Sequence, residues 1–95
     1  MFRNRRTPTI VGPLTHERLR AWLVAELASR AKCAESEVDP AKPFDAYGLD
    51  SRASIELSGA LEKVVGHRLS PLVLFDHPTI DDLADYLARE IPLHS

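Results

Sequence analysis

The pair Asp50-Ser51 is the part of this sequence best placed to do chemistry. Loop-forming residues precede Gly48 and apolar residues at helical spacing follow Ser51, so the serine is expected at a helix N-terminus. Asp50 would be the N-cap, because its carboxylate can accept hydrogen bonds from the free N–H groups of the first turn. These N–H groups and the positive end of the helix dipole favour a phosphate. A phosphodiester on Ser51 would therefore be well placed, although Asp and Ser are also ordinary helix-start residues.

The helix that carries Ser51 is expected to end at Val65, where Gly66 supplies a residue that tolerates the left-handed conformation. One face of this helix is apolar and should pack inward: Leu57, Leu61 and Val64. The opposite face should point to solvent and is a candidate docking surface for a partner: Arg52, Ile55, Glu56, Gly59 and Glu62. Single apolar residues are common on protein surfaces, so Ile55 alone does not establish docking.

A first helix is expected before this one, with Thr15 as its N-cap and its end near Ala31. Its buried stripe is Leu19, Trp22, Leu23 and Leu27. Residues 32–49 form a long connection, which in a small domain must be anchored. The expected anchors are Phe44, Tyr47 and Leu49, and Gly48 permits the turn just before the next helix.

Two further segments complete an all-α fold. Ser70 and Pro71 predict the N-cap and first residue of a short helix that continues through Phe75. Thr79 and Asp82 predict the start of a last helix. Its buried stripe is Ile80, Leu83, Ala84, Leu87 and Ile91. The expected architecture is a small four-helix bundle, with three longer helices, one short helix and a long loop between the first two.

Ninety-five residues allow one small domain. We expect a disordered leader over residues 1–13, the folded domain over 14–91 and a C-terminal tail over 92–95. The basic start is followed by Thr-Pro-Thr rather than by a secretory apolar stretch, and no apolar run has the length of a membrane span. A cytoplasmic monomer is expected.

The charge pattern argues against nucleic-acid binding. Residues 1–49 carry eight Lys/Arg and six Asp/Glu, whereas residues 50–95 carry four and eight. An acidic half suits partners with basic docking patches, or it is simply a solvated surface. Cys33 is the only cysteine and the four histidines lie far apart, so we expect neither an internal disulfide nor a metal site.

Several motifs in order resemble an acyl carrier protein of the type that serves modular polyketide synthases, over roughly residues 15–91. They are Gly48-Leu49-Asp50-Ser51, Ile55-Glu56-Leu57, Leu61-Glu62 and Leu74-Phe75-Asp76-His77-Pro78-Thr79-Ile80. The resemblance implies that a phosphopantetheinyl transferase esterifies Ser51 with 4′-phosphopantetheine from coenzyme A, and that Asp50 helps to orient the Mg²⁺-bound coenzyme A. The thiol of the arm would carry acyl groups between enzymes, including downstream synthase or transferase domains. The helix after Ser51 would be the recognition element, and the chain would not itself be a catalyst.

Arg52 departs from the family's commoner pattern, in which Leu or Met follows the serine. The run Asp50-Ser51-Arg52-Ala53, with Leu57-Ser58-Gly59 and Leu69-Ser70-Pro71, is similar to carrier domains that fatty acyl-AMP ligases load with an activated fatty acid. The alternatives are a peptidyl or aryl carrier domain of a nonribosomal peptide pathway, and a small helical interaction module without a prosthetic group. A serine hydrolase would need His67 or His77 within reach of Ser51.

Overall fold

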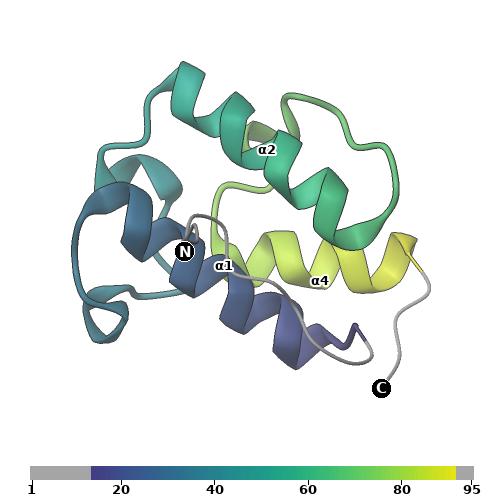
Figure 1. Ribbon diagram of the computed structural model, residues 1–95, viewed down its shortest axis with the longest axis horizontal. Coiled ribbons are helices and arrows are strands. Elements are labelled where there is room, and N and C mark those ends of the chain that lie inside the picture. The colour runs from purple at the N-terminus through teal and green to yellow at the C-terminus, as the bar shows by residue number, and fades with distance from the viewer. Residues whose placement is uncertain (1–13, 92–95) are drawn as a thin grey trace, which may run out of the picture.

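The computed structural model describes residues 14–91, which form a bundle of α-helices joined by loops and two short 3₁₀ turns (Figure 1). In chain order the elements are α1 (His16–Ala31), η1 (Glu35–Glu37), η2 (Phe44–Tyr47), α2 (Ser51–Val65), α3 (Val73–Asp76) and α4 (Ile80–Glu90). The all-α architecture expected from the sequence, with three longer helices and one short helix, is confirmed. The expected leader (1–13) and tail (92–95) lie outside the described residues.

Helix α1 begins where the sequence predicts, because the Thr15 hydroxyl accepts a hydrogen bond from the Arg18 N–H at 3.0 Å. It ends at Ala31, as predicted, and the residue that follows, the C-cap Lys32, adopts the left-handed conformation with φ 59°. The whole predicted stripe is buried, and Trp22 belongs to the hydrophobic core.

The connection between α1 and α2 is anchored at and next to its second 3₁₀ turn, η2. Phe44 and Leu49 are buried, and the Tyr47 hydroxyl accepts a hydrogen bond from the Asp39 N–H at 2.6 Å. The Phe44 N–H donates to the Pro78 carbonyl at 2.8 Å, which ties the loop to the segment before α4. Gly48 turns the chain with φ 80°, as expected for the residue that leads into α2.

The short helix α3 starts later than the sequence predicts. We expected Ser70 as its N-cap and Pro71 as its first residue, but the helix begins at Val73 and Leu72 precedes it. The Ser70 hydroxyl instead accepts from the Leu72 N–H at 3.1 Å, and the Ser70 carbonyl from the Val73 N–H at 3.1 Å. These hydrogen bonds form a turn before α3, so the serine that resembles a helix N-cap stabilises this turn instead.

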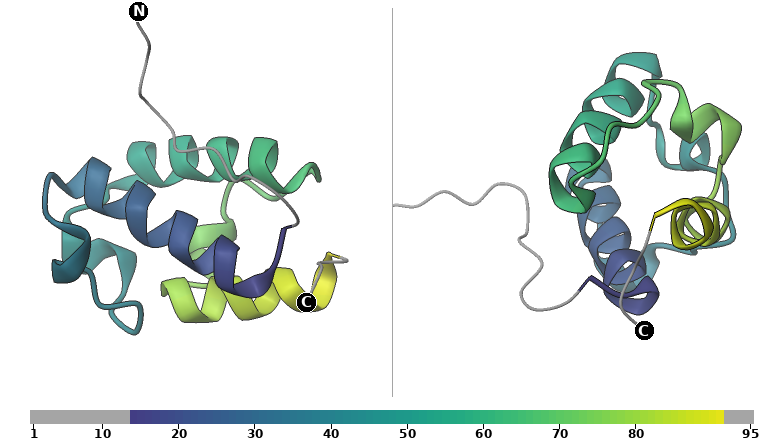
Figure 2. Two further views of the ribbon diagram at one scale, coloured as in Figure 1. Left: turned by 60° about the horizontal axis from the view of Figure 1, so that its bottom comes forward. Right: turned by 90° about the vertical axis from the view of Figure 1, so that its right-hand side faces the viewer.

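Helix α4 is capped by Thr79, whose hydroxyl accepts from the Asp82 N–H at 3.0 Å. Its predicted stripe is buried, although the helix ends at Glu90, one residue before Ile91. Helices α1 and α4 lie side by side (Figures 1 and 2), and two exposed contacts link them: an ion pair between Arg20 and Asp81 at 2.7 Å, and a hydrogen bond between His16 Nε2 and Asp85 Oδ1 at 2.8 Å. Within residues 14–91, none of the helices combines the length and the hydropathy that crossing a lipid bilayer requires.

Candidate functional site

Ser51 is the first residue of α2 and is exposed. Asp50 is the N-cap, as predicted: its backbone is extended, and its Oδ1 accepts a hydrogen bond from the Ala53 N–H at 2.8 Å. The cap fixes the first turn of the 15-residue helix, to which Ser51 belongs. The side chain of Ser51 therefore projects from a fixed helix corner into solvent.

The Ser51 hydroxyl has no hydrogen-bond partner among the residues that the structure describes. The histidine that could be suspected of activating it, His77, stacks instead on Tyr86 with ring centroids 4.0 Å apart, and its Nδ1 lies 3.5 Å from Asp82 Oδ1. His77 is thus a packing residue between α3 and α4. An exposed hydroxyl that is not hydrogen-bonded to a base is suited to accept a group inside a partner's active site, and poorly suited to act as a nucleophile by itself.

Large apolar side chains are exposed on α2 and at α3. Ile55 on α2 is 46% exposed, and Leu72 and Phe75 at α3 are each 53% exposed. Helices α2 and α3 contact each other, and Figure 2 shows α3 beside α2. Exposed hydrophobic groups of this size on neighbouring elements are typical of a surface that a partner covers.

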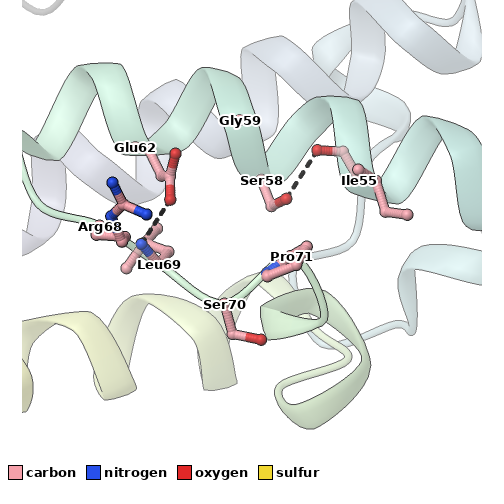
Figure 3. A pocket seen from close by; sticks show the side chains of 8 residues that line it. All are labelled: Ile55, Ser58, Gly59, Glu62, Arg68, Leu69, Ser70 and Pro71. Carbon is pink, nitrogen blue, oxygen red and sulfur yellow. Dashed lines mark hydrogen bonds between the residues drawn. The ribbon is translucent and has the colours of Figure 1, made fainter.

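A groove of about 590 Å³ runs along α2 and the segment that follows it (Figure 3). Its lining residues are Ile55, Ser58, Gly59, Glu62, Arg68, Leu69, Ser70 and Pro71. The Glu62 carboxylate accepts a hydrogen bond from the Leu69 N–H at 2.7 Å and so fastens the far wall to α2. A Cβ built at Gly59 would meet no atom within 4 Å, which leaves the floor of the groove open.

The five predicted docking residues divide into two sets. Arg52, Ile55 and Glu56 are exposed, as expected. Gly59 and Glu62 are only partly exposed: both line the groove between α2 and the chain after Gly66, and Glu62 is held there by the Leu69 N–H. These two residues form part of the groove rather than of an open helix face.

An ionic network that was not predicted from the sequence begins beside Ser51 and links α2 to α1. Arg52 Nε lies 3.5 Å from Glu56 Oε2, and Arg30 Nη1 lies 3.5 Å from the other oxygen of the same carboxylate. Arg30 also donates from Nε to Glu26 Oε2 at 3.1 Å. The Glu26 residue is only 4% exposed, and its Oε1 has no hydrogen-bond partner in the described part of the chain. The spacing could have predicted the pair between Glu26 and Arg30, because Glu26 lies three residues after Leu23, on the buried stripe of α1, and four residues before Arg30.

Charge is balanced on α2 itself, which carries Arg52 and Lys63 against Glu56 and Glu62. The acidic surplus of the second half of the chain lies largely on α4, where Asp81 pairs with Arg20 and Asp85 contacts His16, both from α1. Across residues 14–91, no cluster of three or more His, Cys, Asp or Glu side chains is arranged to hold a metal ion.

Comparison with known families and sequences gives a consistent result. Residues 21–87 match the family model described as "Phosphopantetheine attachment site". The chain is 40% identical over 74 residues to one of the large proteins of the phenolphthiocerol/phthiocerol polyketide synthase of Mycobacterium tuberculosis, a match that covers 78% of this chain. The matched segment is 4% of the length of that synthase protein.

Solved structures of similar fold include carrier proteins that are close to this chain in size. An acyl carrier protein from Anabaena sp. PCC 7120 with a variant phosphopantetheinylation-site sequence superposes with a TM-score of 0.77 at 30% identity, covering 93% of this chain and 97% of that one. A free-standing peptidyl carrier protein from Acinetobacter baumannii gives 0.74 at 35% identity, covering 79% and 94%.

Proposed function

We propose that Ser51 receives the 4′-phosphopantetheine arm in this chain, which belongs to the phosphopantetheine attachment-site family and is a non-catalytic carrier protein of the polyketide synthase type. The observation that carries the proposal is the exposed Ser51 hydroxyl at a capped helix start. The surroundings of Ser51 also fit the arm, because the hydroxyl is unengaged and the N-terminus of α2 favours the phosphate.

In the attachment step, the Ser51 oxygen forms a bond to the phosphorus next to the pantetheine half of coenzyme A. The P–O bond to the nucleotide half breaks, and adenosine 3′,5′-bisphosphate leaves. We propose that the proton of the hydroxyl passes to the transferase, since within the described residues no base is hydrogen-bonded to the Ser51 hydroxyl and the Asp50 carboxylate is engaged by the Ala53 N–H. Asp50 maintains the helix corner through its bond to Ala53, and we propose that its carboxylate also helps to orient the Mg²⁺-bound coenzyme A.

The bound arm supplies a thiol that holds acyl groups as thioesters. The contribution of this chain is to present that thiol from a rigid helix end, so that each partner meets the cargo at a high effective concentration. Carrier domains of this family work with a phosphopantetheinyl transferase and with synthase partners. Because coenzyme A is the donor of the arm, we also propose that the chain works in the cytoplasm.

We propose that a fatty acyl-AMP ligase loads this carrier. The support is the residue pattern around Ser51, in which the cation Arg52 follows the serine and Ser58-Gly59 occupy the floor of the groove. A peptidyl or aryl cargo is the second candidate, favoured by the similarity to the free-standing peptidyl carrier protein.

The proposed docking surface consists of Arg52, Ile55, Glu56, Gly59 and Glu62, extended by Leu72 and Phe75. Of its exposed apolar members, Ile55 lines the groove and Leu72 and Phe75 lie at α3, and its charged members lie on the same helix as Ser51. A partner that covers this surface would meet both exposed apolar side chains and charged ones, the groups that interfaces combine.

The test of the proposed function is the intact mass of the chain before and after treatment with coenzyme A and a broad-specificity transferase. We expect the mass of one phosphopantetheine to be added, and fragmentation to place it on Ser51. The modified protein is then offered to a panel of acyl-AMP ligases with fatty acids, and to adenylating enzymes with amino or aryl acids. Failure of the first step contradicts the carrier assignment of Ser51, whereas loading only by the second group of enzymes replaces the ligase proposal.

Replacement of Gly59 separates the stability of α2 from access to the groove. Gly59→Ala should raise the free energy of unfolding by about 1 kcal/mol, because alanine favours a helix and its Cβ has space. Gly59→Trp should fill the groove and slow loading by the acyl enzyme while the protein stays folded. Loading kinetics and denaturant unfolding measure the two effects. Lys63→Trp, on the same helix, is the matched control, and equal loading of both tryptophan variants would contradict a role for the groove.

Substitutions at Asp50 separate its cap from its charge. Asp50→Ala should cost about 1 kcal/mol of stability, because the Ala53 N–H loses its acceptor. Asp50→Asn should preserve the cap and the stability but slow phosphopantetheine transfer, if the carboxylate helps to orient the metal-bound donor. Transfer rates from intact mass and unfolding midpoints measure the two effects. Transfer to the Asn variant at the unaltered rate would limit Asp50 to the role of a helix cap.

A further inference from the structure

We propose that Arg52 pairs with the phosphate of the 4′-phosphopantetheine arm and holds the first part of the arm against the start of α2. This inference rests on the proposed attachment at Ser51. It concerns the chain's own cation beside the attachment point and assigns it to the arm rather than only to a partner enzyme.

Arg52 is largely free to take a new partner. Its side chain is 89% exposed, and its contact with Glu56 spans 3.5 Å. That distance is longer than the about 2.7–2.9 Å of a charge-assisted hydrogen bond. Most of the N–H donors of the guanidinium therefore face solvent.

Glu56 does not depend on Arg52 for a counter-charge. Arg30 lies 3.5 Å from its second oxygen, and the Arg30 side chain is only 24% exposed because it is fastened to the buried Glu26. Arg52 can therefore leave Glu56 without isolating that carboxylate. Arg30 is thus the cation that stays with Glu56, and Arg52 is the cation that can move to another partner.

A phosphate on Ser51 would be stabilised by this cation. The first turn of α2 contains no acidic residue, but the carboxylate of Asp50 immediately precedes the serine and would repel a phosphodiester. Free N–H groups and the dipole of a 15-residue helix offset part of this repulsion. The positive charge of Arg52 can offset the remaining repulsion between Asp50 and the phosphodiester.

The geometry allows the contact. Adjacent Cα atoms are about 3.8 Å apart, and helical side chains lean toward the N-terminus. The long side chain of Arg52 can therefore reach a phosphate on the preceding residue. A guanidinium also binds phosphate with two parallel N–H donors, which a carboxylate 3.5 Å away on one nitrogen does not prevent.

The test compares ¹⁵N-labelled protein before and after phosphopantetheinylation, with attachment to Ser51 first verified by mass. The Nε–Hε signal of Arg52 should shift when the arm is added, while the signals of Arg20 and Arg30 stay in place. The shift should diminish as NaCl rises from about 20 mM to about 500 mM, because salt screens exposed charges. The ³¹P signal of the arm should show the same salt dependence.

Variants give the matched comparison. Arg52→Lys should retain the salt-dependent ³¹P response, and Arg52→Gln should lose it. Glu56→Gln removes the competing carboxylate and should increase the paired population by about twofold, the scale of an exposed ion pair. Lys63→Gln, on the last turn of α2, should change nothing.

Identical ³¹P behaviour of the wild type and Arg52→Gln, or an Arg52 signal that ignores the arm, would overturn the inference. Because both are measured on protein whose mass shows the arm on Ser51, neither result touches the proposed function. A mass spectrum without the arm, or with it on another residue, is the separate failure of attachment at Ser51, and the inference fails with it.

Discussion

Ser51→Ala is expected to abolish phosphopantetheine addition while leaving the fold intact. The hydroxyl is the only atom of this side chain that can form the phosphodiester, and it is exposed and makes no hydrogen bond with the described residues. Its loss therefore removes the acceptor without removing a stabilising contact. Alanine also suits the first turn of a helix, so the unfolding midpoint should stay close to that of the wild type. Intact mass after transferase treatment is the measurement.

The matched control is Ser70→Ala, because Ser70 is also exposed and lines the groove but lies outside α2. Its hydroxyl accepts only the Leu72 N–H of a turn, so the variant should fold and should gain the arm at the normal rate. Undiminished addition to the Ser51→Ala protein would mean that another residue carries the arm, and both the proposed site and the Arg52 inference would then fall.

Arg30→Met is expected to lower the free energy of unfolding by about 3 kcal/mol, because a buried carboxylate loses its charged partner. Arg30 donates to Glu26 at 3.1 Å, and Glu26 is 4% exposed. Its second oxygen already lacks a hydrogen-bond partner among residues 14–91, so no described neighbour can take over. Denaturant unfolding of the variant measures the loss.

Two comparisons show whether burial is the cause. Arg20→Met removes an ion pair to Asp81 that is shorter, at 2.7 Å, but roughly half exposed at both ends, and should cost only about 0.5 kcal/mol. The double variant Glu26→Met with Arg30→Met should recover most of the lost stability, since apolar groups tolerate the buried site better than an unpaired charge. Equal losses for Arg20→Met and Arg30→Met would contradict this explanation.

Much of the fold could be predicted because helix ends depend on short-range chemistry. Thr15, Asp50 and Thr79 each cap the helix that the sequence indicates, and each does so by accepting an N–H from three residues ahead. The start of α3 could not be predicted in the same way. Ser70 and Pro71 resemble a helix start, but the tie between Glu62 and the Leu69 N–H holds this segment against α2 as a turn.

The candidate site was predictable only in part, for the same reason. The position of Ser51 at a capped helix corner follows from the residues on either side of it, and the exposure of Arg52 and Ile55 follows from helical periodicity. The position of Gly59 and Glu62 in a groove depends on the path of the chain after Gly66. No local pattern specifies that path.

The amino-acid sequence alone determined where the helices of this carrier lie and that a serine stands at the start of one, because capping and periodicity act within one or two turns. Only the tertiary structure decided which charged side chains have a second partner and which can take a new one. Arg30 and Glu26 lie four residues apart on α1, but Glu56 gains Arg30 as a second cation only because α1 packs against α2, and this leaves Arg52 able to change partners. Contacts between segments distant in the chain are set by how the whole core packs, which no short stretch of residues encodes.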